Sequence, residues 1–219
     1  MTLTQTLIRF PEIALKTRDA HKLRGFFGEL FKEHSPLLHN HYDDGKVRYG
    51  YPLVQYKVID QVPMLTGFGE GSRLLIELFL KIKELDIEGV RYAIHSKNIE
   101  NKIYDLSDFS QLRQYEFKTL WMALNQKNFG IYKNLKTEKE KEQFLNKQLQ
   151  NNILSFYKGV GFRVTERIMV KGDFKEKTTL FKSKKMLVFE GKFVTNALLP
   201  GYAGIGKSTA RGFGTVITV

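Results

Sequence analysis

Three of the five histidines in the chain, His34, His39 and His41, lie within eight residues of one another. If this segment is extended, His39 and His41 project from the same face, because side chains alternate along an extended chain. Two imidazoles on one face can act as general acid and general base, since the histidine pKa lies near neutral pH. The same pair could instead bind zinc or manganese together with Asp43 or Asp44. The spacing alone leaves both chemistries open.

Other groups near the histidines could assist such chemistry. Lys46 could supply a cation for a negatively charged transition state, and Tyr49 a hydroxyl. The remaining histidines have simpler explanations. His34 follows an expected helix, where a partial positive charge is favourable. His21 falls in a first helical turn and His95 in an expected strand, and we expect neither to be catalytic.

The segment 201–219 satisfies two motifs at once. Residues 201–208, GYAGIGKS, match the phosphate-binding pattern G-x-x-x-x-G-K-[ST] of nucleotide triphosphatases. That motif requires a helix directly after it. The eleven residues that follow Ser208 contain two further glycines and then Thr-Val-Ile-Thr-Val, a β-branched run that favours a strand. The context therefore argues against a triphosphatase.

The second motif is GIGKSTARGFG, residues 204–214, in which two Gly-apolar-Gly triplets are separated by five residues. Glycines allow close backbone approach and positive φ, and consecutive N–H groups can bind an anion. A basic and hydroxyl-rich loop of this kind suits a phosphate backbone. A Gly-rich connection before an edge strand is the plain alternative. The residues that we predict to contact such a phosphate backbone in this loop are Gly204, Gly206, Lys207, Arg211, Gly212 and Gly214.

Positive charge is concentrated in the same part of the chain. The net charge is +12, and residues 158–219 hold twelve Lys and Arg against four Asp and Glu. Such a concentration favours a polyanionic partner, most often nucleic acid, although a basic protein without such a partner is the alternative. This region shows no basic amphipathic helix of the kind that binds a membrane surface. Further predicted contacts with a nucleic acid in this region are Arg163, Arg167, Lys182, Lys184 and Lys185.

Cysteine is absent, which excludes disulfides, thiolate metal sites and cysteine nucleophiles. The N-terminal residues do not resemble a signal peptide, and no apolar run reaches transmembrane length. We therefore expect a cytoplasmic protein without a membrane partner.

The first half of the chain predicts a ferredoxin-like βαββαβ order. Residues 19–31 and 72–83 show helical spacing of apolar side chains. The expected strands are residues 2–10, 51–60, 64–67 and 90–95. Residues 100–112 are polar and read as a linker.

The second half repeats this order in a degenerate form. Residues 115–124 favour a strand, and Thr137 and Glu140 form a capping box for a long helix. We expect a basic hairpin with a turn near Gly172 and Asp173, and a last strand at 215–219. No second helix is obvious in this half, and we expect residues 196–202 to replace or shorten it. The expected strands of the hairpin are residues 162–170 and 178–193. The fold class is therefore α+β, with two tandem ferredoxin-like (RRM-like) βαββαβ halves, at residues 1–110 and 111–219.

This combination resembles the CRISPR-associated repeat-processing endoribonucleases, the sixth-numbered Cas family of the repeat-associated mysterious protein superfamily. The resemblance rests on the two halves, the basic hairpin and the loop GIGKSTARGFG, with support from residues 49–57 (YGYPLVQYK) and 151–161 (NNILSFYKGVG). It extends over most of the chain.

The resemblance implies cleavage of a CRISPR repeat without metal or cofactor. In that chemistry the 2′-hydroxyl of the RNA attacks the adjacent phosphate and leaves a 2′,3′-cyclic phosphate. The family's catalytic histidine falls in the region of His39 and His41, with supporting roles for Lys46 and Tyr49. The implied partner is CRISPR repeat RNA or crRNA, and a homodimer or other Cas effector subunits are compatible with it. The alternative is a non-catalytic RNA-binding scaffold subunit of a CRISPR effector complex.

Overall fold

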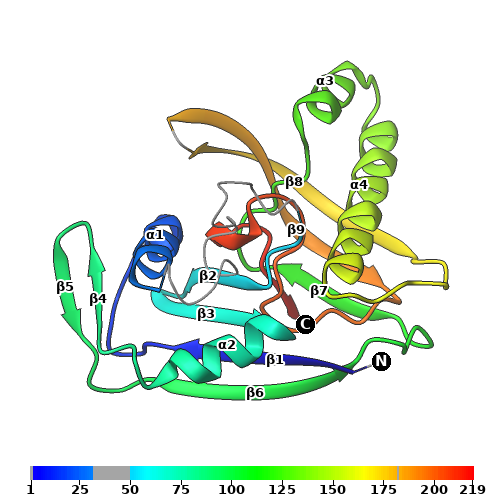
Figure 1. Cartoon of the computed structure of the whole chain (residues 1–219). Coiled ribbons are helices and arrows are strands. Elements are labelled where there is room, and N and C mark those ends of the chain that lie inside the picture. Colours follow the sequence, from blue (N-terminus) through cyan, green and yellow to red (C-terminus); the bar gives the residue numbers. More distant parts are fainter. Residues whose placement is uncertain (1, 32–49, 182) are drawn as a thin grey trace. The chain divides into compact units, whose positions relative to one another are not determined.

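The computed structural model describes residues 2–31, 50–181 and 183–219 of the chain. It is a mixed α+β structure that divides into two compact units (Figure 1). Unit 1 comprises Met1–Asp105 together with Thr209–Gly212, and unit 2 comprises Leu106–Ser208 together with Phe213–Val219. None of the described helices is long and apolar enough to cross a membrane.

Unit 1 is built on a four-stranded antiparallel sheet with the order β2-β3-β1-β6. Its strands are β1 (Thr2–Arg9), β2 (Val54–Ile59), β3 (Val62–Phe68) and β6 (Asn98–Asp105). Helix α1 (Ala20–Leu30) and helix α2 (Glu70–Phe79) pack on one face of this sheet. This order is the ferredoxin-like one, as the sequence predicts.

The apolar spacing of the two helices explains that face. Phe27 of α1 stacks on Phe10 and on Tyr56 of β2, with ring centroids 6.3 and 5.8 Å apart. Helix α2 can lie close to β3 because Gly67 has no side chain. A Cβ at Gly67 would overlap the backbone of Gly71. These contacts leave the other face of the sheet free of α1 and α2.

Two expectations for unit 1 are wrong. Residues 98–105, within and beside the expected linker, form β6, which pairs with β1 along its whole length. Residues Val90–Ala93 form β5, which pairs only with β4 (Glu84–Ile87) in a separate two-stranded sheet. Strand β6 is polar and largely exposed because it lies at the sheet edge, so it lacks the alternating pattern that identifies a half-buried strand.

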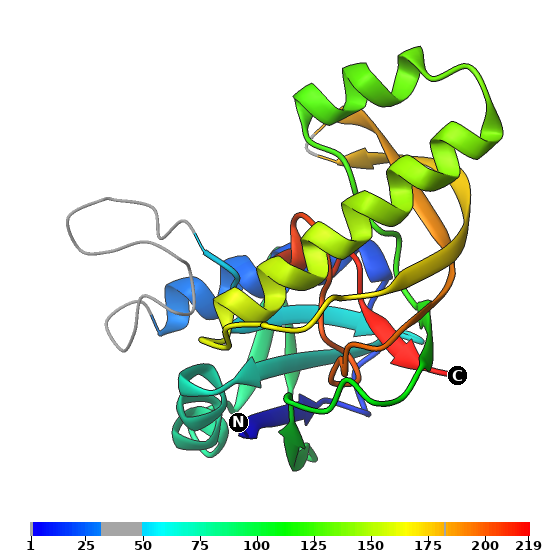
Figure 2. The ribbon, with the colours of Figure 1, turned by 90° about the vertical axis from the view of Figure 1, so that its right-hand side faces the viewer.

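Unit 2 repeats the same strand order as β10-β7-β9-β8. Its strands are β7 (Arg113–Phe117), β8 (Val170–Phe181), β9 (Lys184–Thr195) and β10 (Val216–Thr218). Helices α3 (Gln126–Asn134) and α4 (Glu138–Gly159) follow β7, and α4 packs on β8 (Figure 2). The predicted capping box is present, because Thr137 Oγ1 accepts from Glu140 N and the Glu140 carboxylate accepts from Thr137 N. The α+β class with two ferredoxin-like halves is confirmed.

The basic hairpin differs in detail from the prediction. Strands β8 and β9 pair continuously from Val170 and Thr195 to Phe181 and Lys184, so the hairpin turn comes after Phe181 and not at Gly172 and Asp173. Gly172 lies inside β8, where there is no room for a side chain. A Cβ there would overlap the Phe174 ring and lie 2.9 Å from Phe193 Cβ. Residues 162–169 are not strand, and residues 196–202 are not helical.

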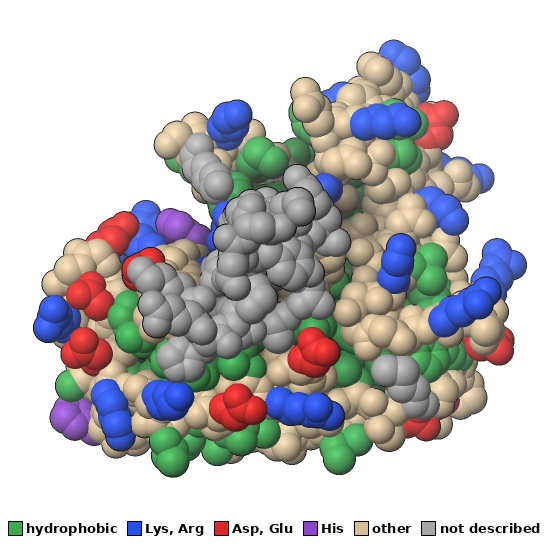
Figure 3. Space-filling model, viewed as in Figure 1, with side chains coloured by type: hydrophobic (Ala, Val, Ile, Leu, Met, Phe, Trp, Pro, Cys, Tyr) green, Lys and Arg blue, Asp and Glu red, His purple; other side chains and the backbone are tan. Residues whose placement is uncertain are grey.

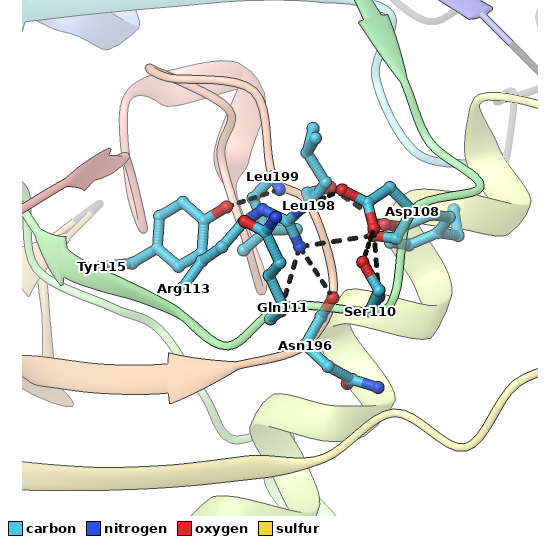
Figure 4. A network of polar contacts seen from close by, with 9 residues as sticks. Asp108, Ser110, Gln111, Arg113, Tyr115, Asn196, Leu198 and Leu199 are labelled. Carbon is cyan, nitrogen blue, oxygen red and sulfur yellow. Dashed lines mark hydrogen bonds and ion pairs between the residues drawn. The ribbon is translucent and has the colours of Figure 1, made fainter.

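A polar network holds the segment that leads into the Gly-rich loop (Figure 4). Arg113 donates to the Asp108 carboxylate and to the backbone carbonyls of Gln111 and Asn196, the latter two at 3.1 and 3.2 Å. Leu199 N donates to Tyr115 Oη at 2.9 Å. Arg113 and Tyr115 of β7 therefore bond to Asn196 and Leu199, in the segment that directly follows β9.

Candidate nucleic-acid interface

The predicted catalytic cluster lies outside the described residues. His39, His41, Lys46 and Tyr49 all fall within residues 32–49, so their arrangement stays a prediction. Two other histidines are described. His21 is exposed with Nδ1 2.7 Å from the Arg18 carbonyl oxygen, and His95 is exposed after β5. No group of three metal-binding side chains occurs in the part of the chain that the structure describes.

The Gly-rich loop folds back on itself as an extended turn. Tyr202 N donates to Val216 O at 2.8 Å, and Ile205 N donates to Gly214 O at 2.8 Å. Gly214 N donates in turn to Leu120 O at 2.9 Å. These bonds use backbone N–H groups that the sequence suggested for anion binding, so the side chains and the remaining N–H groups of the loop are what a ligand can reach.

The loop glycines are required by packing within the protein. Gly206 has φ +108°, and a Cβ there would lie 2.8 Å from the Trp121 ring and 2.9 Å from Asn152 Oδ1. Gly214 has φ +63°, and a Cβ there would overlap the Ile205 carbonyl oxygen. Positive φ and lack of space both exclude larger residues. The pattern of glycines therefore reports the shape of the loop and is not by itself evidence for a ligand.

The nucleotide-triphosphatase interpretation of residues 201–208 does not fit the structure. Ser208 is followed by the short 3-10 helix η3 (Thr209–Arg211) and then by β10, with no α-helix between them. Lys207 N donates to Met122 O at 3.0 Å. The helix N-terminus that would bind a triphosphate is therefore missing from this segment.

The middle of the loop packs inside unit 1. Helix η3 contacts both α1 and β2. Gly212 has φ +87°, and a Cβ there would lie 2.8 Å from Ala20 Cβ and 3.3 Å from the Tyr56 carbonyl oxygen. Arg211 lies directly before Gly212 and is partly buried. Its burial is the main cause that lowers the pKa of its guanidinium, and the positive charge of Arg24 lowers this pKa further.

The loop and the end of the hairpin meet in unit 2. Phe181, the last residue of β8, packs edge-on against Phe213, with ring centroids 5.3 Å apart. Phe181 is paired in register with Lys184, and both Lys184 and Lys185 are exposed. The structure therefore brings two of the predicted RNA contacts of the hairpin toward the Gly-rich loop. Lys182 lies outside the described residues.

Arg163 and Arg167 belong to a different place. Both are exposed in the segment before β8, where Arg163 lines a hollow of about 450 Å³ with Lys158 and Phe162. The twelve residues of β8 separate Arg167 from the hairpin end by about 35 Å at the rise of an extended strand. Lys and Arg side chains also cluster around α3 and α4 on the face shown in Figure 3. The predicted RNA contacts thus form two groups.

Sequence reasoning did not identify two cations of unit 1. Lys57 of β2 is fully buried, and its Nζ donates to Gln55 Oε1 at 2.9 Å. Burial lowers the pKa of Lys57 from 10.5 to about 7. In register with Gln55 across the sheet lies Thr66, also fully buried, on the face away from the helices. The alternation of β2 predicts this shared face, but not that the face would be buried. Arg24, on α1, is the second cation.

Comparison with known proteins shows what kind of protein contains these two units. The model of the Cas6b N-terminal domain matches residues 1–105, and the model of the Cas6b C-terminal domain matches residues 108–219. The chain belongs to the Cas6b family. This confirms the family resemblance that the loop and the two halves suggested.

Solved structures agree with this assignment. A crystal structure of Cas6b is similar with a TM-score of 0.94 and 39% identity, covering 100% of both chains. A crystal structure of CRISPR RNA processing endoribonuclease Cas6b has a TM-score of 0.81 and 35% identity, again over 100% of both chains. An uncharacterized protein of Methanocaldococcus jannaschii is 33% identical over 65% of this chain and 97% of its own length. A type IV Cas6 crRNA endonuclease, at 12% identity over 99% of both chains and a TM-score of 0.59, shares the fold.

Proposed function

We propose that this Cas6b protein is an endoribonuclease that processes CRISPR RNA. The observation that carries the proposal is the match of both halves to Cas6b, including 35% identity over the whole chain to a CRISPR RNA processing endoribonuclease. The concentration of positive charge in residues 158–219 supports a polyanionic substrate.

The proposed reaction uses the RNA's own nucleophile. The 2′-oxygen forms a bond to the adjacent phosphorus as a general base accepts its proton, and the bond to the 5′-oxygen breaks as a general acid protonates it. The products are a 2′,3′-cyclic phosphate and a 5′-hydroxyl. We assign the base and acid to His39 and His41, with Lys46 and Tyr49 as supporting groups, because imidazole can do both tasks near neutral pH.

The proposed binding surface comprises the Gly-rich loop and the end of the hairpin. Lys207 is exposed on the loop, and Lys184 and Lys185 are exposed beside Phe181, which touches Phe213 of the same loop. Cations held on a rigid scaffold can contact successive phosphates, and the affinity should then fall as salt rises. Lys177 is less available, because it pairs with Glu190 at 3.1 Å.

The test is cleavage of the RNA repeat of the protein's own genome in the presence of EDTA. We expect cleavage at one position, with a cyclic phosphate on one product and a 5′-hydroxyl on the other. A matched repeat with a single 2′-deoxy nucleotide at that position should bind with similar affinity and stay intact. Cleavage of the deoxy repeat, or dependence on added metal, would exclude this mechanism. Binding without cleavage by the unsubstituted protein would favour the scaffold alternative.

A further inference from the structure

Strand β6 forms the outer edge of the unit 1 sheet. In the part of the chain that the structure describes, β6 pairs with β1 alone (Figure 1). The outer side of an edge strand presents backbone N–H and C=O groups that a further strand can bond. Natural proteins usually block such an edge, so side chains that favour one particular partner there are informative.

Exposed apolar side chains lie beside this edge. The hydroxyl oxygens of Thr6 and Ser72 are 2.6 Å apart, and Thr6 also donates to Asn101 Oδ1 at 3.3 Å, so α2 runs beside the face of β6 that carries Asn101. Residues two apart in a strand, or four apart in a helix, share a face. This side of β6 and α2 therefore carries four exposed apolar residues, Ile99, Ile103, Ile76 and Leu80. Figure 3 shows hydrophobic side chains along its lower rim, in the part that β6 and α2 occupy in Figure 1.

The opposite face of β6 carries charges of alternating sign. Glu100 and Lys102 flank Asn101, and they form an ion pair at 2.5 Å. Arg9 of β1 donates to the Glu100 carboxylate at 2.9 Å and holds it on this face. Residues 99–103, Ile-Glu-Asn-Lys-Ile, thus run from apolar through acidic, polar and basic to apolar. A strand of this pattern is complementary to its own reverse.

We propose that β6 pairs with β6 of a second copy of this chain, antiparallel and about a two-fold axis at Asn101. In this register Ile99 lies opposite Ile103 of the other copy and Glu100 lies opposite Lys102, and the symmetry repeats each pair. The four-stranded sheets of the two copies then form one continuous sheet. Because residues directly opposite each other share a face, the apolar strips of the two copies lie on the same side of that sheet.

Other registers are less favourable. A shift by two residues places Glu100 opposite Glu100, or Lys102 opposite Lys102, and like charges directly opposite each other are destabilising. A shift by one residue places the apolar face of one copy beside the charged face of the other. Charges commonly protect an edge strand from pairing, but here they select one register and one partner, a second copy of the chain.

The test is sedimentation velocity of the full chain without RNA, over about 1–100 µM protein. We expect a dimer whose population rises with concentration. E100K and K102E should each weaken the dimer about tenfold or more, because like charges then face each other twice. Glu84→Lys is the matched control, because Glu84 is exposed on β4 and the charge change is the same. This control should leave the dimer within about twofold of the unsubstituted protein.

Restoration of the dimer is the sharper part of the test. In an equimolar mixture of E100K and K102E, every charge at the two positions faces its opposite across a mixed dimer. The mixture should therefore regain the dimer, and so should the double variant E100K/K102E alone. Recovery in the mixture also shows that both variants are folded. Ile103→Asp should weaken the dimer about a hundredfold, because it places a charge opposite an apolar side chain twice.

Several outcomes would overturn the proposal. The unsubstituted protein could stay monomeric at every concentration, or the mixture of E100K and K102E could fail to recover the dimer. A dimer that E100K, K102E and Glu84→Lys change equally would place the interface elsewhere. The proposal does not depend on cleavage of RNA, so each of these outcomes leaves the proposed function untouched.

Discussion

The equivalent edge strands of the two units differ in burial. Strand β2 in unit 1 and strand β8 in unit 2 occupy equivalent edge positions in sheets of the same order. All six residues of β2 are buried, whereas Gly172 alone is buried among the twelve residues of β8. Strand β7 pairs with β9 only along Lys192–Thr195, so most of the β8–β9 ribbon extends past it. One topology thus yields a buried cation, Lys57, and a ribbon with exposed cations.

The difference suggests a division of work. A buried cation beside a close-packed loop suits positioning and chemistry, because its pKa is sensitive to its surroundings. Exposed lysines on a long ribbon suit contacts with a phosphate backbone, which need reach more than exact placement. We therefore expect substitution of His39 or His41 to change rates and substitutions in the ribbon to change affinities.

The largest expected effect is the loss of cleavage rate on substitution of His39 or His41. His39→Ala or His41→Ala should lower the single-turnover cleavage rate by about 10²–10⁴-fold, because each removes an acid–base group. Affinity for uncleavable RNA should change by less than about threefold. Rapid-quench cleavage and filter binding measure the two quantities. His95→Ala is the control, because His95 is exposed and lies outside residues 32–49, which contain the predicted catalytic residues. Loss of affinity in place of rate would break the proposed division.

Gly214→Ala should give the largest loss of stability. The new Cβ would overlap the Ile205 carbonyl at a positive φ, so we expect a destabilisation of about 3 kcal/mol in urea unfolding. Gly201→Ala is matched to it, because a Cβ there would meet no heavy atom within 4 Å. Equal stability of the two variants would mean that the loop glycines serve the ligand and not the packing.

The pH dependence of unfolding tests the buried cation. Since burial lowers the pKa of Lys57 from 10.5 to about 7, the unfolded chain binds more protons between these values and stability rises with pH there. We expect the unsubstituted protein to gain about 2 kcal/mol between pH 7 and 9 relative to Lys57→Met. Lys57→Met should also be the more stable protein at pH 7. Parallel stability curves for the two proteins would show that Lys57 stays charged in the fold.

The ribbon lysines have the smallest expected effect. Lys184→Gln and Lys185→Gln should each weaken RNA binding about threefold to tenfold and reduce the salt slope by about one. The cleavage rate at saturating protein should stay unchanged. Lys147→Gln on α4 is the control, because Lys147 is exposed and bonds to Gln150 of the same helix. A change of rate with unchanged affinity would place the ribbon in the chemistry.

Much of the fold follows from local patterns in the sequence. The capping box at Thr137 and the apolar spacing of α4 predicted a helix whose Leu149, Ile153 and Phe156 are fully buried. Such features need only neighbouring residues. Strand β6 could not be predicted in this way, because it is polar at a sheet edge, and the glycine at 172 suggested a turn where it serves packing against Phe193.

The sequence predicted that the site would bind a phosphate backbone, but it did not identify all of the cations that lie near it. The motif drew attention to Arg211, yet Arg24 and Lys57 gave no signal of their own. A lysine that alternates with apolar residues in a strand reads as solvent-exposed, and its burial depends on segments far away in sequence. The place of Arg211 depends likewise on η3 returning to α1, which no local pattern specifies.

That return of Thr209–Gly212 to unit 1 has a consequence for biosynthesis. A ribosome adds about 5–20 residues each second, so residues 1–105 are made roughly 5–20 s before the segment that completes their unit. During that interval Ala20 and the Tyr56–Lys57 backbone lack the neighbour that Gly212 provides in the finished protein. Completion of the first unit to begin synthesis therefore waits for almost the whole chain.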